Sequence, residues 1–187
     1  VALKAPRAQR TRFVWARIGT SLTVLGWLFH LAGTVLRGVA AERVPWSNMY
    51  EFALTGMLLV VTVYLGVLFR FDLRFLGSFI LGLAVVLLGG ATLAYYVEVV
   101  PLADPLKSIW LVIHVFVATL ASAFFALAFA LSVMQLIQAR RERKVLQAEM
   151  DGVDLAKVKT GPRFLTTLPS ADSLESLAYR FAIIGFI

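Results

Sequence analysis

The stretch that decides the fold is residues 110–137, WLVIHVFVATLASAFFALAFALSVMQLI. It carries no formal charge, and about 20 apolar residues suffice for a helix to cross a bilayer. One histidine, His114, lies a helical turn from its start. Steps of four residues from His114 reach four small side chains on the same helical face, Ala118, Ser122, Ala126 and Ala130. Because small residues let helices approach closely in lipid, this row predicts a packing face.

Two interpretations of His114 remain open from the residues alone. A titratable side chain inside a span is costly, and it indicates a functional site by default. The alternative is an imidazole that packs against a neighbouring helix through a hydrogen bond.

Composition indicates an integral membrane protein. The chain has 187 residues, is 60% hydrophobic and has a mean hydropathy of +0.83. Soluble domains are about 45–50% apolar. Because the sequence has no cysteine, a disulfide framework, a thiolate metal site and a thiol nucleophile are excluded.

The hydrophobic pattern predicts an all-α, polytopic transmembrane helix bundle with four complete spans and a truncated fifth. The spans are expected at about 13–36, 50–69, 75–96 and 110–137. Residues 1–137 would form a basic lead and the four-helix bundle. Residues 138–173 would form a cytoplasmic polar linker, the first part of which extends the fourth helix to about Met150. Residues 174–187 would begin a fifth helix, with Ser170 as a capped start.

The basic residues predict the orientation. Of 18 Lys and Arg residues, 15 lie on one side of the predicted spans, and three lie on the other, Arg37, Arg43 and Lys107. The positive-inside rule therefore predicts a cytoplasmic N-terminus. The net charge of +7 is then an orientation signal and no indication of nucleic-acid binding. Both histidines are expected toward the exterior.

Several residues near this exterior side are candidates for a site. His30 shares a helical face with glycines in the first span. Trp46 is either an interfacial anchor in a loop or part of the lining of a site. Pro45 ends any helix, and Glu51 near the start of the second span suits the helix dipole.

The two imidazoles favour haem on chemical grounds. Proton relays use intramembrane carboxylates, and the hydrophobic interiors of the spans hold none. Metal transport would usually use more ligands than two histidines. Haem needs one or two axial imidazoles and an apolar, aromatic slot. The alternative is a structural or transporter subunit whose histidines only pack.

Three stretches resemble the CcsA/CcsB/ResC family of cytochrome c biogenesis proteins, which belongs to the haem-handling superfamily. They are FHLAGTVLRG (29–38) with VPWSNMYEF (44–52), LKSIWLVIHVFVATLASAFFALAFALSVMQL (106–136) and LPSADSLESLAYR (168–180). The resemblance implies a component of the System II cytochrome c synthase (haem lyase) complex. Its location would be the bacterial inner (plasma) membrane, with the haem site toward the exterior or periplasm.

The resemblance also implies partners and a ligand. With a ResB-type membrane protein, the chain would export haem and present it to the Cys-x-x-Cys-His motif of apocytochrome c. The histidine of the family's Trp-Leu-x-x-His-Val motif is one of two external axial ligands to haem iron, and here it corresponds to His114. Trp110, Trp46 and His30 are the other candidate haem-binding residues, and packing through a hydrogen bond is the alternative for His30. The family's tryptophan-rich WWD segment and second external histidine are expected beyond Ile187, so the chain is expected to be an N-terminal part that supplies half of the site.

Overall fold

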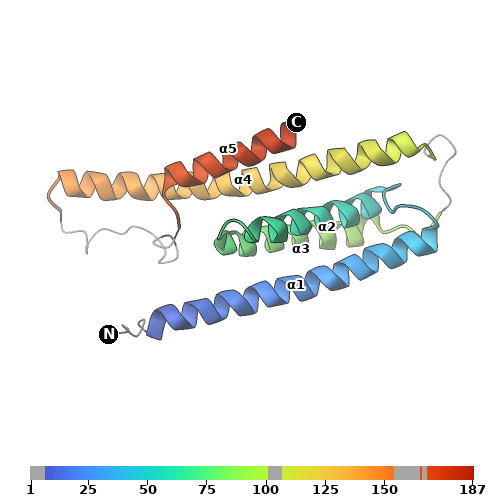
Figure 1. Cartoon of the computed structure of the whole chain (residues 1–187), viewed down its shortest axis with the longest axis horizontal. Coiled ribbons are helices and arrows are strands. Elements are labelled where there is room, and N and C mark those ends of the chain that lie inside the picture. The colour runs from blue at the N-terminus through green and yellow to red at the C-terminus, as the bar shows by residue number, and fades with distance from the viewer. Residues whose placement is uncertain (1–6, 101–106, 154–164, 166–167) are drawn as a thin grey trace. The chain divides into compact units, whose positions relative to one another are not determined.

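The computed structural model describes residues 7–100, 107–153, 165 and 168–187. The predicted lead at 1–6 and the linker at 154–164 lie outside them. The described chain contains helices and no strand (Figure 1). They are α1 (Arg7–Ala41), α2 (Met49–Leu68), the 3-10 turn η1 (Arg74–Leu76), α3 (Gly77–Tyr95), α4 (Ile109–Met150) and α5 (Ala171–Phe186).

Four of these helical segments are long and apolar enough to cross a membrane, which confirms the predicted all-α bundle of four spans. They are Val14–Ala41, Met49–Leu68, Arg74–Tyr95 and Ile109–Met150. The chain divides into two compact units, residues 1–120 and 121–187.

In the first unit, α1, α2 and α3 run in alternating directions (Figure 1). α2 and α3 pack along buried side chains three or four residues apart, among them Val61, Tyr64, Ile80 and Ala84. α3 begins at Gly77, which packs closely against Tyr64 of α2. A Cβ at Gly77 would lie 2.7 Å from the Tyr64 hydroxyl. The absence of a side chain there lets the two helices join through a short link.

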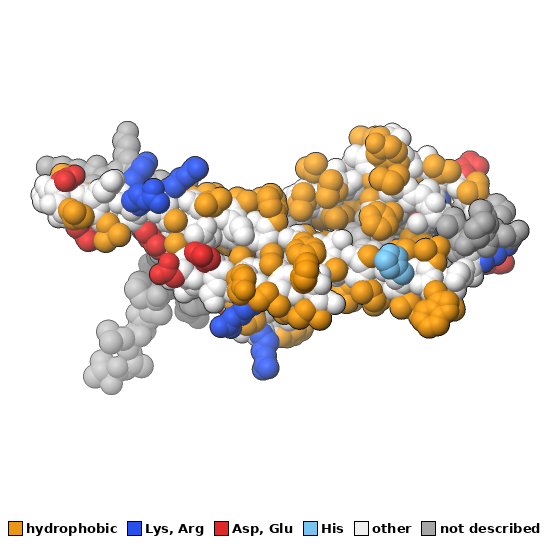
Figure 2. All heavy atoms as spheres, turned by 90° about the horizontal axis from the view of Figure 1, so that it is seen from above, with side chains coloured by type: hydrophobic (Ala, Val, Ile, Leu, Met, Phe, Trp, Pro, Cys, Tyr) orange, Lys and Arg blue, Asp and Glu red, His pale blue; other side chains and the backbone are white. Residues whose placement is uncertain are grey.

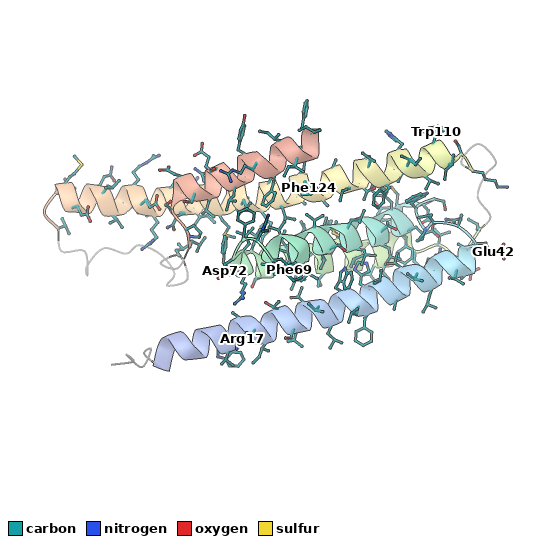
Figure 3. All side chains as sticks on the ribbon, viewed as in Figure 1. Arg17, Glu42, Phe69, Asp72, Trp110 and Phe124 are labelled. Atoms are coloured by element: carbon teal, nitrogen blue, oxygen red, sulfur yellow. The ribbon has the colours of Figure 1, made fainter. Side chains whose placement is uncertain are left out.

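α1 ends in a tight turn that fixes the direction of the chain after it. The N–H of Glu42 donates to Val39 O and that of Arg43 to Gly38 O, each at 3.2 Å. This hydrogen-bond pattern is a Schellman motif, in which the residue after the helix is left-handed. Glu42 accordingly has φ 52° (labelled in Figure 3). The turn carries Arg43 back toward the start of α2.

α2 begins at a buried carboxylate. The side chain of Asn48 caps the helix by accepting the Glu51 N–H at 2.9 Å. The Glu51 carboxylate is 0% exposed and receives Arg37 Nε at 3.0 Å and Arg43 Nη1 at 2.6 Å. The Ser47 N–H and hydroxyl each donate to it at 3.1 Å. Glu51 thus joins the end of α1, the connecting link and the start of α2. We call this region, where α1 and α3 end and α2 and α4 begin, the Glu51 end.

In the second unit, polar contacts fix the start of α5. The Ser170 side chain accepts the Ser173 N–H, which confirms the predicted cap. The Ala171 N–H donates to Glu142 Oε1 at 3.1 Å. Glu142 lies on the part of α4 that continues to Met150. Its carboxylate also suits the positive end of the α5 dipole.

The other end of α5 packs closely on α4. A Cβ at Gly185 would lie 3.0 Å from Ala121 O, so only glycine fits without a shift. Phe124 and Phe181 stack between the two helices with ring centroids 6.3 Å apart. The two helices of this unit therefore form an antiparallel pair, held by a polar contact at one end and a small residue at the other.

The contact between Gly77 and Tyr64 predicts a position-specific response to alanine. Gly77→Ala should destabilise the protein by about 1–3 kcal/mol, because the buried Tyr64 ring cannot move away freely. Gly82→Ala is the matched control, since a Cβ there meets nothing within 4 Å. Thermal unfolding in detergent measures both. Addition of Tyr64→Phe should recover part of the Gly77→Ala loss, and equal stability of the two alanine variants would contradict the contact.

The buried carboxylate predicts a larger effect. Glu51→Ala should destabilise the protein by about 3 kcal/mol or more, because two shielded guanidinium groups lose their counter-charge. Glu98→Ala removes an exposed carboxylate at the same end of the bundle and should change stability by less than about 0.5 kcal/mol. The unfolding midpoints of the two variants provide the comparison, and similar midpoints would disprove the importance of the Glu51 contacts.

Candidate functional site

His114 lies on the second turn of α4 with its side chain exposed. Its neighbours at helical spacing are also exposed and apolar, Trp110 at 76%, Ile113 at 47% and Val117 at 56%. These four residues form what we call the His114 face. Trp110 is labelled at the start of the helix in Figure 3. In Figure 2 hydrophobic side chains cover much of the visible surface of the helices, and an imidazole lies among them.

The predicted packing row below His114 is wrong in its first half. Ala118 and Ser122 are exposed, whereas Thr119 and Ala123 one position further along are buried. α4 meets α2 through Thr119, because a Cβ at Gly56 would lie 3.7 Å from Thr119 Cγ2. The small residues that follow His114 therefore continue an open surface in the described chain.

The directions of α2 and α4 show where His114 lies along the helix axes relative to Glu51. α2 and α4 begin at the same end and run in the same direction (Figure 1). Gly56 faces Thr119, and five residues earlier on each helix lie Glu51 and His114. With equal rise per residue, the imidazole is level with the buried carboxylate. His114 is about 140° around α4 from Thr119, so it projects from a side of α4 that does not face α2.

His30 occupies a different environment on α1. Its half-buried imidazole contacts Leu54 O through Nε2 at 2.9 Å. A carbonyl only accepts, so Nε2 carries the proton and Nδ1 of the neutral ring does not. His30 also lines an apolar groove of about 440 Å³ between α1, α2 and α3, together with Gly26 and Trp27. The contact with Leu54 is the kind that packs a histidine against a neighbouring helix.

No described contact joins the two histidines. α1 meets α2 through a hydrogen bond of 2.8 Å from Trp27 Nε1 to Thr62 Oγ1. Thr62 is about 120° around α2 from Gly56, where α4 packs. α1 and α4 therefore contact different sides of α2. His30 and His114 are at the same end of the unit, but α2 lies between their helices.

Trp46 lies in the link between α1 and α2. Its side chain is half-buried, and its backbone N–H donates to Val44 O at 3.1 Å. The Thr55 hydroxyl donates to Pro45 O at 2.6 Å and holds this link on α2. Trp46 is therefore at the Glu51 end, as are His30, His114 and Trp110.

The arginine–carboxylate cluster was not expected from the sequence, which assigned Glu51 only to the helix dipole. Beyond Glu51, Arg37 Nη2 donates to Val97 O at 2.7 Å and Arg43 Nη2 donates to Val100 O at 3.2 Å. Both carbonyls belong to the segment that follows α3. A signal was present in the sequence: two of the three basic residues on the predicted outer side, Arg37 and Arg43, precede the carboxylate by 14 and 8 residues.

Two tyrosines enclose one arginine of this cluster. The Arg37 guanidinium carbon lies 5.5 Å from the centre of the Tyr50 ring and 6.0 Å from that of Tyr96. The two rings meet edge to face with centroids 5.3 Å apart. These are cation–π and aromatic contacts between the start of α2 and the end of α3.

Within the described residues, no group of three or more His, Asp or Glu side chains could hold a metal ion. A haem iron does not need such a group, since a single imidazole can bind it axially. The His114 face fits this ligand, because it combines an exposed imidazole with an aromatic and aliphatic surface. His30 is half-buried and its Nε2 donates to Leu54 O, so only its Nδ1 could act as a ligand.

The comparisons with known proteins agree with the resemblance found in the sequence. Residues 46–187 match the family described as cytochrome C assembly protein. A region is 35% identical over 117 residues to protein NrfI of Wolinella succinogenes. That match covers 58% of this chain and 12% of NrfI, so the chain spans only a small part of this relative. No solved structure matches the chain. Because the family match extends over most of the sequence, the chain belongs to the cytochrome C assembly protein family.

Proposed function

We propose that the chain binds haem at the outer face of the membrane through His114 and, with a ResB-type partner, exports and presents it to apocytochrome c. The observation that carries this proposal is the exposed imidazole of His114 on an apolar face of a membrane-spanning helix. Family membership supports a role in cytochrome c biogenesis. The System II synthase complex is the specific machinery that we propose.

Charge supports the proposed orientation. In the first unit, Arg70 and Arg74 lie between α2 and α3, at the end opposite the Glu51 end. The positive-inside rule makes that side cytoplasmic. The Glu51 end, with His114, Trp46 and Trp110, would then face the exterior or periplasm of a bacterial inner membrane.

The residues of the His114 face have separate parts in this proposal. His114 would bind the iron of the cargo haem through an unprotonated ring nitrogen. Trp110, Ile113 and Val117 would cover part of the apolar porphyrin, which would remove their own apolar surface from lipid or water. Haem itself supplies the vinyl groups to which the thiols of the Cys-x-x-Cys-His motif add. The chain would hold and orient this cargo.

A structural or transporter subunit whose histidines only pack is the second candidate. The bond from His30 to Leu54 O favours this role for His30 itself. It does not account for His114, which has no described hydrogen bond and lies on an exposed face. We therefore propose a packing role for His30 and iron ligation for His114.

The first test replaces the proposed iron ligand. In the complete natural protein with its partner, His114→Ala should abolish the Soret absorbance of the purified complex and cytochrome c maturation in cells. Val117→Ala, on the same face, should retain most of both, because it removes only part of the apolar cover. Retention of haem and maturation by His114→Ala would make the assignment wrong.

The second test separates the packing and ligand roles of His30. His30→Gln keeps an N–H that can reach Leu54 O but gives up the imidazole ligand. We expect haem absorbance like that of the natural protein. His30→Leu should lower the stability by about 1 kcal/mol, because the hydrogen bond is lost. Absorption spectra and thermal unfolding of both variants measure these effects. A folded His30→Gln protein without a Soret band would instead identify His30 as a haem ligand.

A further inference from the structure

The two arginines beside Glu51 each connect its carboxylate to the segment that follows α3. Arg37 binds Glu51 Oε1 through Nε and Val97 O through Nη2. Arg43 binds Glu51 Oε2 through Nη1 and Val100 O through Nη2. One carboxylate on α2 therefore holds two backbone carbonyls three residues apart on another part of the chain.

The shielding of this cluster makes these contacts strong and directional. The side chains of Arg37 and Arg43 are 11% and 9% exposed, and that of Glu51 is 0% exposed. Electrostatic interactions and hydrogen bonds strengthen where water is excluded. A guanidinium group has several donors in one rigid plane, so it can hold a carboxylate and a carbonyl together, whereas a lysine ammonium is a compact point charge.

The segment held in this way is 96–100, which has no helical structure. It is attached at three points: the Tyr96 ring against Tyr50 and Arg37, Val97 O, and Val100 O. It belongs to the connection between α3 and α4. α4 then carries His114 on its second turn, level with Glu51. The arginine contacts therefore hold the first part of the connection that leads from α3 to the helix of the proposed ligand.

We propose that Glu51 is a positioning residue for the His114 site, which it influences by holding segment 96–100 through Arg37 and Arg43. This inference rests on the proposed haem binding at His114. Glu51 touches no ligand in this role. Its carboxylate orients the two guanidinium groups, and their bonds to Val97 O and Val100 O hold the described start of the connection to α4. The competing explanation is a cluster that stabilises the fold and has no effect on haem.

Arg43→Lys separates these explanations. The lysine keeps a positive charge for Glu51 but lacks the fork that also reaches Val100 O. The variant is compared with the natural protein in the complete complex, by hydrogen exchange of segment 96–100 and by haem titration at the Soret band. We expect faster exchange in 96–100 and about tenfold weaker haem binding, with an unfolding midpoint close to that of the natural protein. Arg74→Lys is the matched control, because Arg74 pairs with Asp72 at 3.5 Å in an exposed position at the other end of α2.

Each outcome decides between the two roles. Faster exchange with unchanged haem affinity would show that the cluster only stabilises the fold, and would overturn the proposal. Unchanged exchange would also overturn it, since segment 96–100 would not depend on Arg43. If the natural complex binds no haem, the proposed function itself fails, and the exchange measurement still reports on the arginine contact. Should Arg43→Lys fail to fold, Arg37→Lys breaks the other bridge and undergoes the same measurements.

Discussion

The Glu51 carboxylate accepts hydrogen bonds from Arg37, Arg43 and Ser47 while it is fully shielded from solvent. Burial of three charges is unfavourable unless they are paired with one another. The arrangement therefore depends on several local structures together. The Schellman turn after α1 must return Arg43, the Asn48 cap must begin α2 at the right residue, and segment 96–100 must supply carbonyls. The order of these elements at the Glu51 end follows from this one requirement.

The helices themselves were predictable from the sequence because lipid leaves the backbone few choices. A chain inside hydrocarbon must satisfy its N–H and C=O groups within itself, so a long apolar run becomes a helix. The spans predicted for α2 and α3 agree with the observed helices within about two residues. α1 begins earlier and ends later than predicted, and α4 continues beyond its predicted span to Met150, as its predicted extension requires. Pro45 lies outside a helix as expected, and Ser170 caps α5. In each case the deciding physics is local to a few neighbouring residues.

The surroundings of each side chain were less predictable. In a membrane both the buried and the lipid-facing sides of a helix are apolar, so hydropathy does not distinguish them. The spacing of Ala118 and Ser122 therefore predicts a packing face, whereas Thr119 makes the contact with α2. Glu51 was missed for a related reason. Its pairing with Arg43 depends on a left-handed residue at Glu42, a position that no hydrophobic period marks.

The two histidines show why placement decides chemistry. In the sequence both lie on rows of small residues near the same end of a span. In the structure His30 satisfies its Nε2 on Leu54 O, whereas His114 is exposed and no described hydrogen bond fixes its ring. An imidazole without such a bond is poorly suited to packing in lipid, where polar groups need partners. A ligand that takes up a ring nitrogen and also covers the apolar side chains around it would remove this cost. Haem, the cargo proposed for this site, combines both properties.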